Sequence, residues 1–313
     1  MKRITFGLLI LELMLASFAG EIFCQAQAQN SQTTSTIRWE WTDDGWTRRV
    51  EIHGKAEFNE DYSDVKSVTE GGFLRIEESH GGQTYQMLFR RDENGQLLRK
   101  YLVNGEVRSL DENGRKWIAG LLLTAVRQGA IDTDKRVSTM LRQGGVSAVL
   151  EEIASITGDY AKRIYFQSLL KNDSLTPSNL QKVLASLKTQ IISDHEKANL
   201  LKQSADPFLR NSTVSAGFFQ AVSSITSDYE RRLTLSDVVK RRNLSEQVLE
   251  QMLDSASTIS SDYEKATFLL EASNLYMGET RMRKAFLRAV ETIKSDHERG
   301  RVLSALLKNK QIS

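Results

Sequence analysis

The chain contains few of the residues that usually carry catalysis or form cross-links. Its 313 residues include one cysteine, two prolines and four histidines. Because Cys24 is the single thiol, the chain forms no internal disulfide and no metal site built from several thiolates. The histidines are scattered, at positions His53, His80, His195 and His297.

Motifs of known catalytic types are also missing. His195-Glu196 resembles the start of the zinc-protease motif His-Glu-x-x-His, but Asn199 occupies the position of the second histidine. His297-Glu298 also lacks the second histidine of the motif, because Arg301 occupies its position. The sequence has no Gly-x-Ser-x-Gly nucleophile elbow and no Gly-x-x-x-x-Gly-Lys phosphate loop. We therefore predict a protein that is not an enzyme and has no cofactor or metal. An enzyme of unrecognised type is the remaining alternative.

The N-terminus has the composition of a secretory signal. Two basic residues precede an apolar stretch over 4–20, and small residues suited to cleavage follow at Ala19-Gly20 and at Ala28. We predict a cleaved signal peptide over 1–28, a linker over 29–35 and an extracytoplasmic chain, periplasmic or secreted.

Neither sign of charge dominates. Lys and Arg number 42 against 40 Asp and Glu, a net charge of +2, so we expect no nucleic-acid partner. An uncut membrane anchor is the alternative to signal cleavage, but Glu12 in the apolar stretch disfavours it. No later apolar run approaches the roughly 18 residues of a membrane span. We expect no stable membrane insertion after cleavage.

Polar and apolar side chains alternate through 36–112. This period of two predicts strands at 37–41, 46–52, 73–77, 84–89, 97–103 and 106–108. Turn sequences such as Asp44-Gly45 and Asn104-Gly105 separate them and favour hairpins. We therefore predict an antiparallel β-meander with one covered face. Residues 59–69 form a longer connection or contain a short edge strand at 65–68.

Three of the four tryptophans lie in the first predicted hairpin, at Trp39, Trp41 and Trp46. They form either an aromatic platform for a partner or part of the sheet core.

The C-terminal half repeats one phrase. Its five copies are Gly158-Asp159-Tyr160-Ala161-Lys162, Ser193-Asp194-His195-Glu196-Lys197, Ser227-Asp228-Tyr229-Glu230-Arg231, Ser261-Asp262-Tyr263-Glu264-Lys265 and Ser295-Asp296-His297-Glu298-Arg299. The intervals between the aspartates are 35, 34, 34 and 34 residues. A fixed period of this size is typical of stacked units that cannot bury their apolar faces alone. We predict a helical domain over 113–313, an α-solenoid of hairpins of about 34 residues with a shortened capping unit at 116–157. The fold class is then α+β.

Apolar residues recur at fixed distances from each aspartate. Isoleucine stands three residues before it in every copy, and an apolar group stands ten before and seven after. These spacings place apolar stripes on a helix before the phrase and on a helix after it. The phrase itself has the form of a capping box. Its serine accepts the backbone N–H three residues on, and its glutamate reaches back to the serine N–H.

The phrase also builds two columns. Its bases are Lys162, Lys197, Arg231, Lys265 and Arg299, and its rings are Tyr160, His195, Tyr229, Tyr263 and His297. Stacked hairpins would align these residues as a surface for a protein or peptide partner. The alternative is that the rings pack between helices while each base forms a weak pair within its own helix.

The combination of motifs resembles a known group. Val50-x-Ile52-x-Gly54, Phe58, Asp64-Val65 and Gly71-Gly72-x-Leu74-x-Ile76-x-Glu78 precede the Ser-Asp-Tyr-Glu-Lys-type repeats. Together they resemble a group of uncharacterised exported bacterial proteins. The module is also similar to the extracytoplasmic extension of some membrane metallopeptidases of the β-lactam-sensor type. The resemblance implies an envelope-located binding module. It implies no peptidase activity, because the sensor's membrane helices and zinc motif have no counterpart.

We therefore predict a non-catalytic interaction or scaffold protein. It would bind a protein or peptide through the helical-repeat surface or the tryptophan region. The alternative is an envelope-sensing accessory module that binds a small molecule or a cell-wall fragment.

Overall fold

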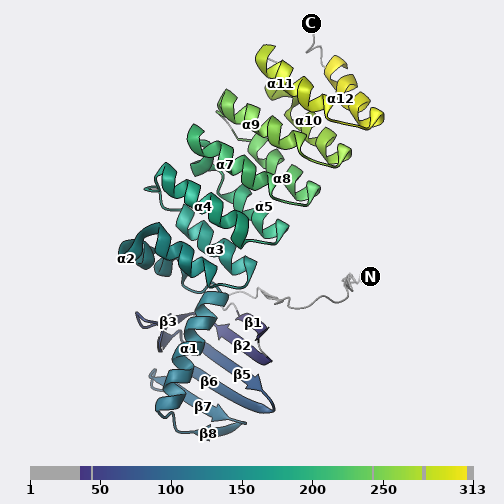
Figure 1. Cartoon of the computed structure of the whole chain (residues 1–313). Coiled ribbons are helices and arrows are strands. Elements are labelled where there is room, and N and C mark those ends of the chain that lie inside the picture. The colour runs from purple at the N-terminus through teal and green to yellow at the C-terminus, as the bar shows by residue number, and fades with distance from the viewer. Residues whose placement is uncertain (1–35, 44, 242, 277–279, 309–313) are drawn as a thin grey trace, which may run out of the picture. The chain divides into compact units, whose positions relative to one another are not determined.

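The structure, a computed structural model, describes residues 36–43, 45–241, 243–276 and 280–308. The predicted signal peptide and linker therefore lie outside the described residues. The chain is α+β, with an antiparallel sheet followed by a helical region (Figure 1). It divides into two compact units. The first contains the described residues up to Lys55 together with Val68–Arg108, and the second contains Ala56–Ser67 and the chain from Ser109 onward.

The first unit is a six-stranded sheet in the order β1-β2-β5-β6-β7-β8, with every neighbouring pair antiparallel. Its strands are β1 (Thr36–Asp43), β2 (Trp46–His53), β5 (Phe73–His80), β6 (Gln83–Arg91), β7 (Leu97–Val103) and β8 (Glu106–Arg108). Each strand contains one of the six predicted ranges and extends up to three residues beyond it, because the alternation and the Gly-containing turns both determine where a strand can run.

The register places the apolar side chains of the sheet on one face. Val50 lies opposite Trp39 and Ile76, and Ile76 lies opposite Met87. Successive side chains of a strand point to opposite faces, so the intervening charged residues share the other face. The apolar side chains of this set are buried: Trp39, Trp41, Val50, Ile52, Leu74, Ile76, Met87 and Phe89.

Strands β3 (Ala56–Phe58) and β4 (Val65–Val68) form a separate two-stranded sheet. A strand at 65–68 was one of two expectations, but it pairs with β3 rather than with an edge of the main sheet. The connecting Tyr62 explains why most of this hairpin belongs to the helical unit. Its hydroxyl donates to Asp132 at 2.9 Å, and the guanidinium of Arg136 lies 4.6 Å from its ring centroid.

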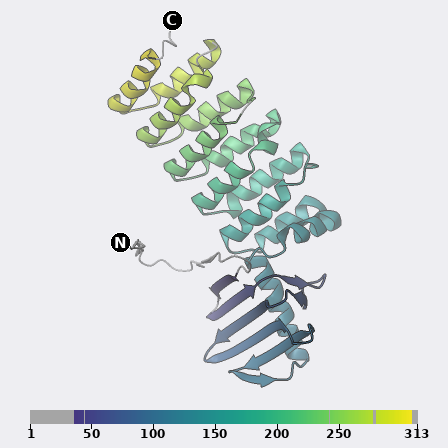
Figure 2. The same cartoon turned by 180° about the vertical axis from the view of Figure 1, so that it is seen from behind.

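The second unit contains all the described helices. They are α1 (Glu112–Gln128), α2 (Thr133–Ala154), α3 (Asp159–Leu170), α4 (Pro177–Gln190), α5 (Asp194–Gln203), α6 (Asp206–Leu209), α7 (Ser212–Ser223), α8 (Asp228–Val239), α9 (Glu246–Ser257), α10 (Asp262–Tyr276), α11 (Thr280–Glu291) and α12 (Asp296–Lys308). Helices α4, α7, α9 and α11 pack side by side in one row, and α3, α5, α8, α10 and α12 in another (Figures 1 and 2).

The periodic apolar positions form the core of this unit. The five isoleucines three residues before each aspartate are buried, as are the five apolar residues ten before it: Ile156, Ile191, Ile225, Ile259, Ile293, Val149, Leu184, Phe218, Met252 and Phe286. Helix α2 is interrupted at Gly145, which has a φ of 65°. That break lets residues 133–154 act as two shorter helices at the start of the array.

Candidate functional site

The repeated phrase lies where the second helix of each hairpin begins, as expected. Helices α3, α5, α8, α10 and α12 all start at the aspartate of the phrase. Each cap serine accepts the backbone N–H of the glutamate three residues on, at 3.3 to 3.4 Å, in the copies at Ser193, Ser227, Ser261 and Ser295. The serine half of the predicted capping box is therefore confirmed, while Gly158 offers no side-chain cap.

The glutamate half of the predicted capping box is wrong. The N–H of each cap serine donates to the aspartate of the preceding hairpin, at 2.6 Å for Ser193 to Asp159 and 2.7 Å for Ser261 to Asp228. The same bond joins Ser227 to Asp194 and Ser295 to Asp262. With that donor already bonded, the glutamates of the phrase turn to basic partners, as where Glu264 accepts from Arg232.

Each of these four aspartates also accepts a second backbone N–H, from the residue before the cap serine of the following hairpin. These donors are Ile192, Thr226, Ser260 and Lys294, at 2.8 to 3.1 Å. Such N–H groups precede a helix and lie at the positive end of its dipole, so a carboxylate is the favourable partner. Burial opposes the effect, but the bonds from Thr226 and Ser227 lower the pKa of Asp194. The aspartate therefore holds the next hairpin in place.

Four of the five bases are structural, which corrects their assignment to a partner-binding surface. Lys162, Lys197, Arg231 and Lys265 are buried, with Lys265 only 4% exposed. Three of them donate to the carbonyl that ends the first helix of the next hairpin: Lys162 to Gln190 at 2.7 Å, Arg231 to Thr258 at 2.9 Å and Lys265 to Thr292 at 3.1 Å. The negative end of a helix dipole attracts a cation there. We call each aspartate and base together a junction clamp.

The fifth base differs from the others. Arg299 is 39% exposed along its side chain and donates to the carbonyl of Ile293 within its own hairpin.

The column of rings, in contrast, remains at the surface. Tyr160, Tyr229 and Tyr263 are 38%, 54% and 57% exposed, and the side chains of His195 and His297 are more exposed still. These five residues, which we call the ring row, are the part of the phrase whose side chains remain exposed in every copy. The alternative that the rings pack between helices does not hold for the structure.

Arginines and glutamates connect the ring row from one hairpin to the next. The guanidiniums of Arg163, Arg232 and Arg301 lie 5.0, 5.4 and 5.1 Å from the ring centroids of Tyr160, Tyr229 and Tyr263, respectively. Arg163 also donates to Glu196 of the following hairpin, and the Nδ1 of His195 bonds Glu230 of the hairpin after that. Stacking on a cation and pairing with a carboxylate hold these side chains in fixed positions, which lowers the entropy lost when they bind a partner.

The tryptophans divide between core and surface. Trp39 and Trp41 are 5% and 7% exposed and belong to the covered face of the sheet. Their assignment to a partner surface is therefore corrected, since their side chains point to the apolar face with Val50. Trp46 is half-buried and stacks on His80, with ring centroids 4.6 Å apart.

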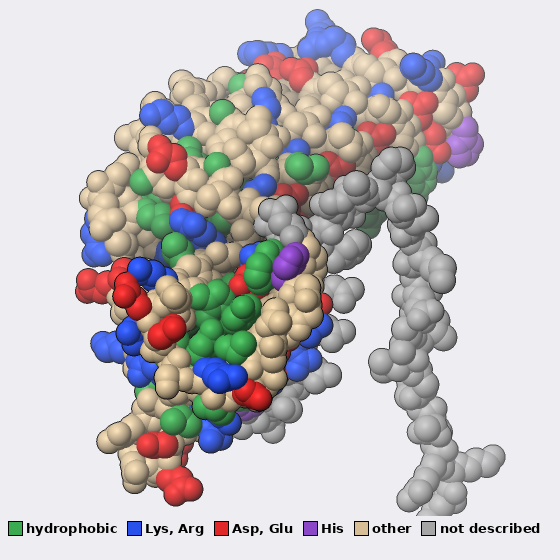
Figure 3. All heavy atoms as spheres, turned by 60° about the horizontal axis from the view of Figure 1, so that its bottom comes forward, with side chains coloured by type: hydrophobic (Ala, Val, Ile, Leu, Met, Phe, Trp, Pro, Cys, Tyr) green, Lys and Arg blue, Asp and Glu red, His purple; other side chains and the backbone are tan. Residues whose placement is uncertain are grey.

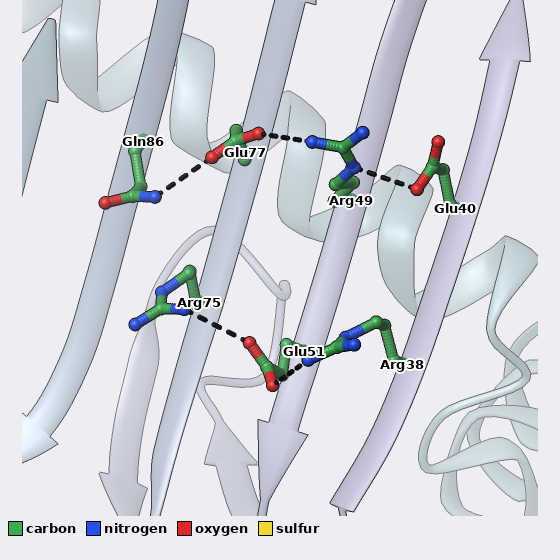
Figure 4. A pocket seen from close by; sticks show the side chains of 7 residues that line it. All are labelled: Arg38, Glu40, Arg49, Glu51, Arg75, Glu77 and Gln86. Atoms are coloured by element: carbon green, nitrogen blue, oxygen red, sulfur yellow. Dashed lines mark hydrogen bonds and ion pairs between the residues drawn. The ribbon is translucent and has the colours of Figure 1, made fainter. Parts of the chain in front are cut away.

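The polar face of the sheet carries an ion-pair lattice (Figure 4). Its members line a hollow of about 380 Å³: Arg38, Glu40, Arg49, Glu51, Arg75, Glu77 and Gln86. Glu51 accepts from Arg38 at 2.7 Å and from Arg75 at 3.2 Å. Arg49 donates to Glu40 and to Glu77. The sequence prediction missed this lattice, although Arg-x-Glu recurs at 38–40, 49–51 and 75–77 and provides the signal.

A buried polar network at the start of the helical array was also missed. Arg136, 5% exposed, donates to the Tyr165 hydroxyl at 2.8 Å and to the carboxylate of Glu152. Glu152 accepts a second bond from Arg127 of α1 at 2.8 Å. Burial raises the pKa of Tyr165, so its hydroxyl stays protonated. No sequence pattern indicated this network, because its members are 9 to 38 residues apart and belong to three helices.

Other candidate site types find little support within the described residues. No three His, Cys, Asp or Glu side chains among them are arranged to hold a metal ion. None of the described helices is long and apolar enough to span a membrane. On the face that Figure 3 shows, Lys and Arg side chains are interspersed with Asp and Glu.

Comparison of the chain with models of known protein families, with curated proteins and with solved structures finds no match. The resemblance to exported bacterial proteins therefore depends on its motif residues alone.

Proposed function

We propose that the chain is a non-catalytic interaction protein whose hairpins stack as an α-solenoid and bind a protein or peptide partner through the ring row. The observation that carries this proposal is that residues of one phrase differ in burial and bonding. Serine, aspartate and base are used in joining hairpins, while the rings at the same position of five successive hairpins remain exposed. An exposed row that continues across stacked units is suited to an elongated partner.

The chemistry of the ring row favours a polypeptide. Tyrosine and histidine offer an apolar face and a polar group on a short side chain, the combination enriched in protein interfaces. Charged side chains of both signs lie beside the ring row. Arg232 stacks on Tyr229, and Glu230 bonds His195. Such a surface contacts apolar side chains through the rings and backbone or charged groups through their edges.

The experiment compares capture of partners by matched variants. The purified chain would be immobilised, exposed to an extract of the cell envelope and analysed by mass spectrometry. We expect the amount of a captured partner to fall by about tenfold or more for the double variant Tyr229→Ala/Tyr263→Ala. Truncating central aromatic residues of an interface typically has an effect of this size. The control is Leu275→Ala, which truncates an exposed side chain elsewhere on α10. Equal capture by wild type, double variant and control would contradict the proposal.

An envelope-sensing module for a small molecule or a cell-wall fragment is the second candidate, supported by the hollow of about 380 Å³ on the sheet. Its guanidiniums and carboxylates are already paired with one another, so a ligand would have to replace bonds such as Arg75 to Glu51. Loss of small-molecule binding on Arg75→Ala, with no effect of the two tyrosine changes, would favour this candidate. The proposed extracytoplasmic location depends on residues 1–28, and detection of the chain in a periplasmic or secreted fraction tests it.

A further inference from the structure

The three tyrosines of the ring row carry hydroxyl groups that the protein itself does not use. Within the described residues, the hydroxyls of Tyr160, Tyr229 and Tyr263 form no hydrogen bond. The buried Tyr276 of the same unit, in contrast, donates its hydroxyl to the carbonyl of Leu249 at 3.0 Å. A tyrosine hydroxyl is both a donor and an acceptor. The ring row therefore offers donors at its surface to the acceptors of a partner.

The charges beside these rings are balanced within the protein. Each of the three guanidiniums that stack on the tyrosines also pairs with a glutamate: Arg163 with Glu196, Arg232 with Glu264 and Arg301 with Glu298. The side chains of these glutamates are only 13% to 19% exposed. A carboxylate that is mostly buried and already paired gains little from a second cation. The tyrosine positions therefore favour an uncharged partner segment, whose acceptors are its backbone carbonyls.

The spacing of the rings suits one backbone conformation. Helices α3, α5, α8, α10 and α12 pack in succession, and each ring is the second residue of its helix. Packed helices lie about 8–10 Å apart, so successive rings are separated by about that distance. A polyproline II segment advances about 9.3 Å in each turn of three residues, which brings every third residue to a ring. A β-strand repeats its face about every 6.6 Å and does not match.

An α-helical segment with one contact in every seven residues would also match, at about 10.5 Å. Its carbonyls, however, are already bonded within the helix and cannot accept from the tyrosines. A polyproline II segment has no internal hydrogen bonds, and aromatic side chains are its usual docking surface. We infer, on the basis of the proposed function, that the ring row binds an uncharged, proline-rich segment in the polyproline II conformation, with every third residue on a successive ring.

The experiment uses peptides that differ in register alone. The probe is a fluorescent peptide of five Leu-Pro-Pro triplets, and its binding to the purified chain is measured by fluorescence anisotropy. A second peptide has the same composition, with its leucines moved out of the three-residue register. We expect the probe to bind about tenfold more tightly, because only its leucines reach successive rings together. Removing one triplet at a time should weaken binding at every step.

Tyrosine variants connect this binding to the ring row. Tyr229→Phe combined with Tyr263→Phe keeps both rings and removes their hydroxyls. We expect it to weaken binding of the probe by about fivefold or more, because two hydrogen bonds are lost. Tyr229→Ala combined with Tyr263→Ala should weaken binding further. Leu275→Ala is the matched control and should bind as wild type does. Circular dichroism checks that the variants keep their helices.

Several outcomes would overturn the inference. They are equal affinity for the two peptides, full affinity in the phenylalanine variant, or tighter binding of a helical heptad-repeat peptide. Loss of envelope capture in the alanine variant, with no binding of either proline-rich peptide, would overturn the polyproline II assignment and leave the proposed function standing. Unchanged capture by the alanine variant would instead contradict the proposed function.

Discussion

The carboxylate of Asp228 accepts the backbone N–H of Ser261, 33 residues later, at 2.7 Å. The bond joins the start of α8 to the start of α10, and the same bond recurs at three other junctions. Because the donor is also the cap residue of its helix, one aspartate determines both where the next helix begins and where the next hairpin lies.

Removing a clamp aspartate should destabilise the helical unit. Asp228→Ala leaves the N–H groups of Ser260 and Ser261 without their carboxylate, and we expect a loss of about 1–3 kcal/mol in the free energy of unfolding. Urea denaturation measures it. Asp254→Ala, which removes an exposed carboxylate of α9, serves as control and should change stability by less than about 0.5 kcal/mol. Equal losses in the two variants would show that the clamp bonds contribute nothing.

The corrected capping box makes a separate prediction about which residues are coupled. Ser261→Ala should cost about 1 kcal/mol, because it removes the cap acceptor of the Glu264 N–H. In double-mutant cycles based on chemical denaturation, the Glu264 side chain should couple to Arg232 by up to about 1 kcal/mol. Its coupling to Ser261 should be near zero. A larger coupling to Ser261 than to Arg232 would restore the reciprocal capping box.

The clamp predicts acid sensitivity. Hydrogen bonds from Thr226 and Ser227 and the charge of Lys197 lower the pKa of Asp194 below its usual value of 3.8, although burial opposes this. A carboxyl whose pKa is lower in the folded state contributes stability above its unfolded pKa and loses it as the pH falls through the folded pKa. The stability difference between wild type and Asp194→Ala should therefore be constant from pH 7 to about pH 5 and shrink below about pH 4. Thermal melts across this range test it, and a difference that grows toward low pH would refute the sign.

The buried network should be among the most sensitive positions of the helical unit. Arg136→Met removes the bonds to Tyr165 and Glu152 and leaves a buried carboxylate with Arg127 as its remaining basic partner. We expect a loss of about 3 kcal/mol in stability, as when one member of a buried ion pair is removed. Arg142→Met, on the exposed side of α2, is the matched control. Similar melting temperatures for the two variants would show that the network is dispensable.

Truncation of Trp39 and of Trp46, which lie in different environments, should lower the free energy of unfolding by different amounts. Trp39→Ala truncates a side chain in the covered face and should cost about 3–5 kcal/mol. Trp46→Ala, which removes a half-buried ring stacked on His80, should cost clearly less. Chemical denaturation followed by far-ultraviolet circular dichroism compares them. The reverse order would place Trp46 rather than Trp39 in the core.

Much of the fold was predictable because its causes are local. The alternation along Trp46–His53 and the tight turns determine strands and their covered face. The five-residue phrase, which recurs about every 34 residues, determines where α5, α8, α10 and α12 begin. The site was less predictable. Sequence alone aligned Lys265 and Tyr263 as two equivalent columns, but the structure buries the first at 4% exposure and exposes the second at 57%.

The sequence by itself determined the period, the element types and the serine caps, because each depends on residues within a few positions of one another. The tertiary structure alone decided which residues remain available to a partner. Lys265 bonds the Thr292 carbonyl 27 residues away, and Asp262 bonds the Ser295 N–H 33 residues away. Bonds over such separations exist only once the hairpins stack, and stacking turns half of the repeated phrase into internal structure while leaving the ring row at the surface.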